Sequence, residues 1–167
     1  MNDAHLHVVV NHFPIIGTIF GLGILIAGIV LKNKSVKTVA YVLFIIAALF
    51  GAFSMGTGEG AEELVEDMPS VGKQIIHEHE ELAETLALLL YIIGAFSILS
   101  LYFSIKKIVF EKYTSILVVA IALIAVYFAK QVGTSGGEIR HTEIRANATA
   151  SPETQNAKET EQGEKED

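Results

Sequence analysis

Four long apolar segments divide the chain, and polar residues separate them. The first two segments, at about 13–31 and 39–55, contain no charged side chain. The next two, at about 82–105 and 113–130, hold Glu84 near the start of the third and a lysine at the end of the fourth. A transmembrane helix needs about 20 mostly apolar residues. The pattern therefore predicts an all-α fold, an integral membrane four-helix bundle.

The lysines predict how the bundle is oriented in the membrane. The turns at 31–38 and 105–113 are both rich in lysine, and the positive-inside rule places such turns in the cytoplasm. The N-terminus, the 56–77 loop and the C-terminus then lie outside, with all of the nineteen acidic residues except Glu111. We expect a multi-pass protein of the cytoplasmic (inner) membrane. The lysines that set this orientation are Lys32, Lys34, Lys37, Lys106, Lys107 and Lys112.

Composition narrows the domain organisation and the chemistry. A single four-helix transmembrane domain at 1–145 is followed at 146–167 by a Glu-, Lys- and Thr-rich tail without apolar periodicity, which we predict to be disordered and acidic. The net charge of −7 and the lack of a basic stripe argue against nucleic acid. The chain has no cysteine, which excludes disulfides, thiolate metal sites, iron–sulfur clusters and covalently attached haem.

The two halves of the chain follow a similar plan. Each predicted helix pair begins with histidines, turns through lysines and ends in a glycine cluster, at 56–60 in the first pair and 133–137 in the second. A duplicated helical hairpin would produce this pattern, with a pseudo-two-fold axis along the membrane normal. The alternative is that glycines simply end both helices. In either case we expect the helices to end at these clusters.

The start of the third helix carries the strongest group of chemically active side chains. Residues three and four apart share one helical face, so His77, Glu80, Glu81 and Glu84 lie together. Glu84 falls inside an apolar run, where facing lipid is expensive, and we expect it to point into the bundle with His77 and Glu81. His79 is expected to point elsewhere. The alternative is that the acidic side chains of this segment only interact favourably with the positive N-terminal end of the helix dipole.

His12 is the second strong candidate. Asn11 is a good helix N-cap and Pro14 suits a first turn, which would place His12 at the outermost turn of the first helix, as a metal ligand or proton carrier. An interfacial histidine that bonds a headgroup is the alternative. Further along this helix, Gly23 is expected to let a neighbouring helix approach closely.

Several other outer residues are possible accessories to the same site. We expect His5 and His7 to precede the first helix, and His141 to follow the fourth on a segment that folds back over the bundle. A short amphipathic surface helix is expected at 59–67, which would bring acidic side chains toward His77. The acids concerned are Glu62 and Glu63.

The segment from His7 to Pro14, His-Val-Val-Val-Asn-His-Phe-Pro, resembles the opening of a family of uncharacterised bacterial four-helix membrane proteins with an N-terminal His-x4-His-Phe-Pro motif. That family also has a histidine at the start of its third helix, which His77 or His79 matches. Its Thr-Gly-x-x-Gly-Gly-like turn after the fourth helix is approximated at 132–141, where this chain has Gly-Thr-Ser-Gly-Gly. The resemblance covers about residues 5–145. It implies the fold and the histidine positions, and no activity.

Three functions are consistent with the sequence. The first is electron transfer between a quinone or another membrane redox partner and an outer acceptor, by haem b held between His12 and His77 or His79. The second is a zinc, iron, manganese or copper site on His12, His77, Glu81 and Glu84. The third is a membrane subunit or transporter component without a cofactor, in a homo-oligomer or with partners. No serine–histidine–aspartate spacing indicates an enzyme.

Overall fold

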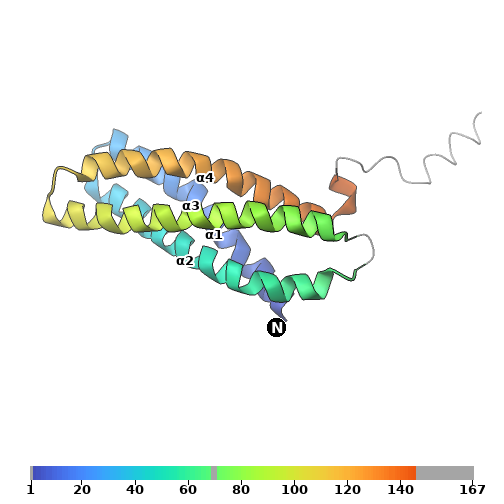
Figure 1. Cartoon of the computed structure of the whole chain (residues 1–167). Helices are drawn as coiled ribbons and strands as arrows, with labels where there is room; N and C mark the ends of the chain where they lie inside the picture. The colour runs from blue at the N-terminus through green and yellow to red at the C-terminus, as the bar shows by residue number, and fades with distance from the viewer. Residues whose placement is uncertain (1, 69–70, 146–167) are drawn as a thin grey trace, which may run out of the picture.

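The computed structural model describes residues 2–68 and 71–145, and in this part of the chain all regular structure is helical. Four helices follow one another up and down, as predicted, and each is long and apolar enough to cross a membrane (Figure 1). The predicted tail at 146–167 lies outside the described residues. The elements are α1 (Asp3–Val30), α2 (Lys34–Val65), α3 (Lys73–Lys106), α4 (Glu111–Arg140) and a 3-10 turn, η1 (Thr142–Ile144).

The helices form a ring in chain order. Each packs on the next, and α4 returns to α1, so α1 lies diagonally opposite α3 and α2 diagonally opposite α4. The two lysine-rich turns lie together at one end of the bundle, here called the lysine end (Figure 1). The start of α1, the α2–α3 connection and the end of α4 lie at the other, here called the histidine end.

The helices are longer than the sequence predicts at the histidine end. Asn2, and not Asn11, caps α1, and its Oδ1 accepts a hydrogen bond from the His5 amide at 3.0 Å. The helix therefore includes His5 and His7 and continues through Pro14. The glycine clusters do not end α2 and α4, and the expected separate helix at 59–67 is mostly the last turns of α2. None of the described glycines has a positive φ, so these clusters act through their small size.

Both turns at the lysine end have the same backbone geometry. Lys32 and Lys107 adopt the left-handed conformation, with φ of 50° and 56°. The amide that follows each lysine bonds five residues back, Asn33 to Gly28 and Ile108 to Phe103, both at 2.9 Å. This is the Schellman motif, which usually places glycine where these lysines stand.

Small residues allow the helices to pack closely around a core that includes Leu25, Phe44 and Ile93. A Cβ added at Gly94 would lie 2.8 Å from the Ala48 Cβ, so α2 and α3 nearly touch there. Gly23 has no such neighbour within 4 Å, and its predicted packing role is wrong. Its stripe faces outward because the buried stripe of α1 passes through Pro14, Thr18, Gly21, Leu22, Leu25 and Gly28.

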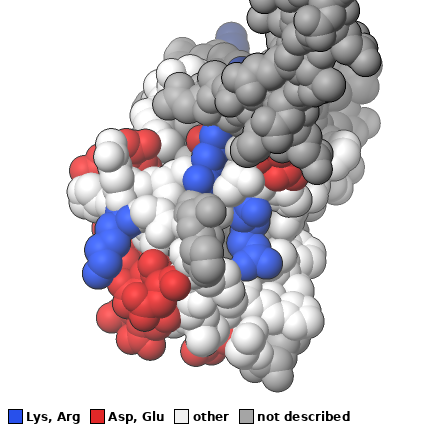
Figure 2. Space-filling view, turned by 90° about the vertical axis from the view of Figure 1, so that its right-hand side faces the viewer, with Lys and Arg blue, Asp and Glu red and all other residues white. Residues whose placement is uncertain are grey.

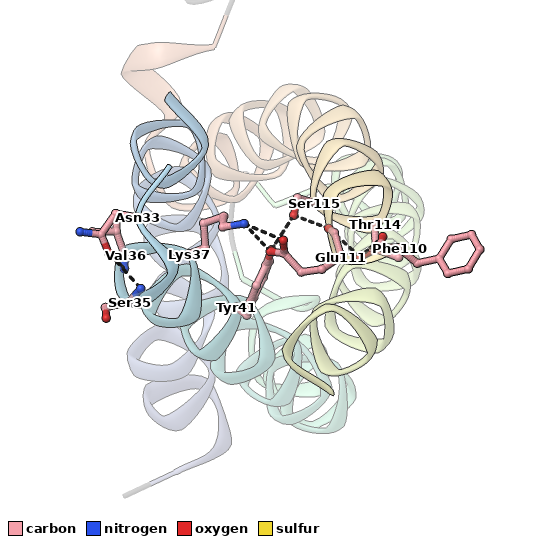
Figure 3. Close-up of polar contacts among 9 residues, drawn as sticks. All are labelled: Asn33, Ser35, Val36, Lys37, Tyr41, Phe110, Glu111, Thr114 and Ser115. Atoms are coloured by element: carbon pink, nitrogen blue, oxygen red, sulfur yellow. Dashed lines mark hydrogen bonds and ion pairs between the residues drawn. The ribbon is translucent and has the colours of Figure 1, made fainter. Parts of the chain in front are cut away.

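At the lysine end, a polar network connects α2 with α4, which lie diagonally opposite each other (Figure 3). Lys37 Nζ donates to both carboxylate oxygens of Glu111 at 2.6 and 2.7 Å. Tyr41 donates to the same carboxylate at 2.7 Å, and its hydroxyl lies 2.6 Å from that of Ser115. The one acid predicted to lie among the cytoplasmic lysines is therefore the centre of a network that joins the two hairpins.

Candidate functional site

A cavity of about 1130 Å³ opens between the helices at the histidine end. Seen from this end, acidic side chains gather together and basic side chains lie beside them (Figure 2). Five of the six histidines line the cavity, which places most of the predicted imidazoles around one space. They are His5, His7, His12, His79 and His141.

His7 is half-buried on α1 and is held by α2. Its Nδ1 lies 3.1 Å from the Ser54 carbonyl oxygen and 3.1 Å from the Thr57 hydroxyl. A Cβ added at Gly58 would meet the His7 ring at 3.9 Å, an ordinary contact distance. The contacts with Ser54 and Thr57 therefore hold an imidazole that was predicted to precede the first helix.

His79 is half-buried on α3 and is held by α4 in a similar way. Its Nδ1 lies 2.9 Å from the Ser135 hydroxyl. A Cβ added at Gly136 would lie 3.0 Å from His79 Cε1, so a larger residue at that position would displace the ring. The second glycine cluster thus leaves room for this imidazole. Because α1 and α3 are diagonal, His7 and His79 line the cavity from opposite helices.

His12 lies at the edge of the cavity. Its ring is exposed, and Nδ1 bonds the Val8 carbonyl of its own helix at 2.7 Å. The same residue lines a second, apolar groove of about 290 Å³ between α1 and α2, together with Phe13 and Phe20. His12 therefore lines both the cavity at the histidine end and an apolar groove between α1 and α2.

The expected orientations of the third-helix histidines are wrong. The His77 side chain is 71% exposed and does not line the cavity; it lies 3.4 Å from Glu81 and 3.9 Å from Glu80 on the helix surface. His79 faces inward instead. The face was inferred from Glu84 alone, whereas the packing of Ile76, Leu86 and Leu90 determines how α3 is rotated.

The acidic side chains divide between the cavity and the surface. Glu84 lines the cavity but is exposed, and the His77 and Glu81 side chains do not accompany it as expected. Glu62 and Glu80 also line the cavity, and their carboxyl groups lie close enough to interact. Glu63 and Glu81 are exposed and do not line it. The predicted ligand group is thus divided: His77 and Glu81 lie together on the helix surface, whereas Glu84 lines the cavity.

Two basic residues at the end of α4 line the cavity and have defined contacts. Arg140, at the end of α4, lines the cavity and its Nη1 lies 3.3 Å from the Met68 sulfur. His141 follows it and bonds Glu143 at 2.9 Å, so its ring is engaged at the surface.

Within residues 2–68 and 71–145, no three or more His, Asp and Glu side chains are arranged to hold a metal ion directly. Sequence reasoning also missed Ser54, Thr57 and Ser135, since a hydroxyl or carbonyl on a distant helix leaves no spacing signal. The repeated pairing of a hydroxyl residue with glycine, Thr57-Gly58 and Ser135-Gly136, is the signal that was available.

Comparison with known proteins adds no relative. No family model matches the chain, and neither a curated protein nor a solved structure is significantly similar to it.

Proposed function

We propose that this four-helix membrane protein binds haem b non-covalently in the outer cavity and transfers electrons. His7 and His79 would be the axial ligands. The observation that carries the proposal is that these two half-buried imidazoles line one cavity from diagonal helices, each held through Nδ1 by a neighbouring helix. Two imidazoles on separate helices are what bis-histidine ligation requires, and a bundle interior supplies an apolar enclosure.

The geometry favours haem over a bare metal ion. A bare ion takes most of its ligands from protein side chains, and the described residues offer no group of three. Haem brings four nitrogen ligands of its own, so a pair of histidines is enough. The cavity volume of about 1130 Å³ leaves room for a large planar ligand.

Other cavity residues suit the remaining parts of haem. Its propionates are anionic, and the Arg140 guanidinium at the rim is able to pair with them. The apolar groove beside His12 suits an isoprenoid quinone as the membrane electron donor or acceptor. The partner on the outer side would accept or supply single electrons.

The first test is a visible spectrum of the purified full-length protein, expressed with haem supplied. Wild type is expected to show a Soret band and sharp visible bands on reduction. His7→Ala and His79→Ala should each lose them, while His77→Ala, the matched change at an exposed position of α3, should keep them. Retention of the bands in both the His7 and His79 variants would overturn the ligand assignment.

The interacting Glu62 and Glu80 carboxyls, which line the same cavity as His79, make a non-haem metal the second candidate. A colourless preparation with stoichiometric metal, lost in Glu80→Gln, would support this candidate and refute the haem proposal. A preparation with neither haem nor a stoichiometric metal would refute both candidates and support a membrane subunit without a cofactor.

We also propose that the histidine end faces the outside of the cytoplasmic membrane, as the positive-inside rule predicts. The chain has no cysteine, so single cysteines can be introduced at Lys34 and Glu66 without interference. A membrane-impermeant maleimide added to whole cells or spheroplasts should label Glu66→Cys and not Lys34→Cys. The reverse pattern would invert the topology.

A further inference from the structure

The two cavity histidines are held by matching pairs of residues. On α2, Thr57 contacts the His7 Nδ1 and Gly58 follows it; on α4, Ser135 contacts the His79 Nδ1 and Gly136 follows it. Each hairpin thus supplies one histidine from its first helix and one hydroxyl–glycine pair from its second. The two sites are related as expected for a duplicated hairpin.

The contacts determine which nitrogen of His7 carries a proton. The Ser54 carbonyl oxygen, 3.1 Å from Nδ1, has no hydrogen to donate, so Nδ1 must be the donor. The Thr57 hydroxyl lies 3.0 Å from the Ser54 carbonyl and 3.1 Å from that of Phe53, and donates there. Its oxygen is then also an acceptor for Nδ1–H.

At His79 no carbonyl oxygen of the described residues contacts Nδ1, so its contacts fit two arrangements. The Ser135 hydroxyl has one hydrogen, which it donates either to the Val132 carbonyl at 3.2 Å or to His79 Nδ1 at 2.9 Å. When it donates to Val132, as Thr57 donates within its own helix, its oxygen accepts from His79 Nδ1–H. No described residue bonds Nε2 of either histidine, so in the Nδ1–H tautomer both Nε2 lone pairs are available to a ligand.

We propose that Thr57 and Ser135 are positioning residues, which hold His7 and His79 in the Nδ1–H tautomer with Nε2 available to an electron-pair acceptor in the cavity. This inference rests on the proposed haem function for the identity of that acceptor. When one ring nitrogen of a histidine binds a metal, a hydrogen-bond partner at the other ring nitrogen fixes the orientation of the ring and raises the basicity of the ligating nitrogen.

The two positions should not contribute equally. His7 keeps the Ser54 carbonyl as an acceptor when Thr57 is changed, whereas Ser135 is the hydrogen-bond partner of His79 Nδ1. Ser135→Ala is therefore expected to weaken haem binding about 10- to 100-fold, the usual effect of losing such a partner. Thr57→Val should have a smaller effect. Ser135→Thr, which retains a hydroxyl, should restore binding.

The glycines provide a second, independent variant. Gly136→Ala would place a Cβ 3.0 Å from His79 Cε1 and should displace the ring, while Gly133→Ala, on the same helix, meets Ile15 at an ordinary 3.9 Å. We expect weakened haem binding in the first variant and wild-type binding in the second.

Two measurements on the full-length protein in detergent test the inference: haemin titration by absorbance, and ¹⁵N-histidine NMR of the haem-free protein. Thr85→Ala is the control, since the Thr85 hydroxyl bonds only its own helix on α3. The NMR experiment should show both rings as Nδ1–H tautomers in wild type, and loss of that state for His79 in Ser135→Ala.

The outcomes separate the two proposals. If wild type binds no haem, the proposed function fails, and the tautomers in the haem-free protein still test the positioning roles. If wild type binds haem but Ser135→Ala binds equally tightly, or if the rings are Nε2–H tautomers, the positioning roles are refuted and the haem proposal stands.

Discussion

Replacing Lys37 with methionine tests how strongly the network at the lysine end joins the two hairpins. The Glu111 carboxylate accepts hydrogen bonds from Lys37 at 2.6 and 2.7 Å, from Tyr41 at 2.7 Å and from Ser115 at 3.1 Å. The Lys37 and Glu111 side chains are only 13% and 12% exposed. This is a buried ion pair with satisfied hydrogen bonds, not a surface one.

The expected loss follows from what Lys37→Met leaves behind. An exposed ion pair contributes about 0–1 kcal/mol to stability, but removing one partner of a buried pair costs about 3–5 kcal/mol because the other charge stays uncompensated. We expect a loss of about 3 kcal/mol, the lower end of that range, since neither side chain is completely buried. The double variant Lys37→Met/Glu111→Leu should recover most of it, because no buried charge remains.

The free energy of unfolding is measured by circular dichroism in mixed detergent–SDS micelles. Lys34→Met, on the same helix but exposed, is the matched control and should be close to wild type. If Lys37→Met is no less stable than Lys34→Met, the Lys37–Glu111 pair contributes no more to the free energy of unfolding than an exposed ion pair, and the prediction is refuted. If the double variant is less stable than either single variant, the uncompensated-charge explanation is wrong.

Other predictions concern packing and turns. Gly94→Ala should destabilise the bundle by about 1–3 kcal/mol, because its Cβ would lie 2.8 Å from that of Ala48, and an unchanged unfolding midpoint would refute this contact. Gly23→Ala, with no neighbour within 4 Å, should stabilise by up to about 1 kcal/mol through helix propensity; a loss in the same assay would show that Gly23 packs against something. Lys32→Gly and Lys107→Gly should each stabilise by about 1 kcal/mol, because glycine relieves the left-handed conformation; a lower thermal midpoint for both would count against this turn geometry.

The main features of the fold were predictable because they depend on composition along the chain. Four apolar runs, the lysine-rich turns and the absence of cysteine are local properties, and the helices occur where the runs are. The helix ends were less predictable. The glycine clusters look like helix ends in sequence, yet α2 and α4 continue through them, and Gly60 packs against Asp3 and Gly136 against His79.

The candidate site was predictable in its residue types and its end of the bundle, but not in its arrangement. His77 and His79 are two residues apart and point to nearly opposite sides of α3, so the rotation of the helix about its axis decides which of them faces inward. That rotation is set by the summed packing of buried residues such as Ile76 and Leu90 along the helix. A single ionisable residue, Glu84, was too weak a guide to it.

Local properties of the chain were enough to predict four apolar helices that run up and down, with histidines at one end and lysines at the other. They also require that any cofactor is held without cysteine, because the chain has none. Two further features needed the packed bundle: His7 and His79 line the cavity from diagonal helices, and Thr57, Ser135 and the Lys37–Glu111 pair connect helices. These are contacts between segments far apart in the chain, and they depend on helix rotation and close approach, which no local pattern encodes.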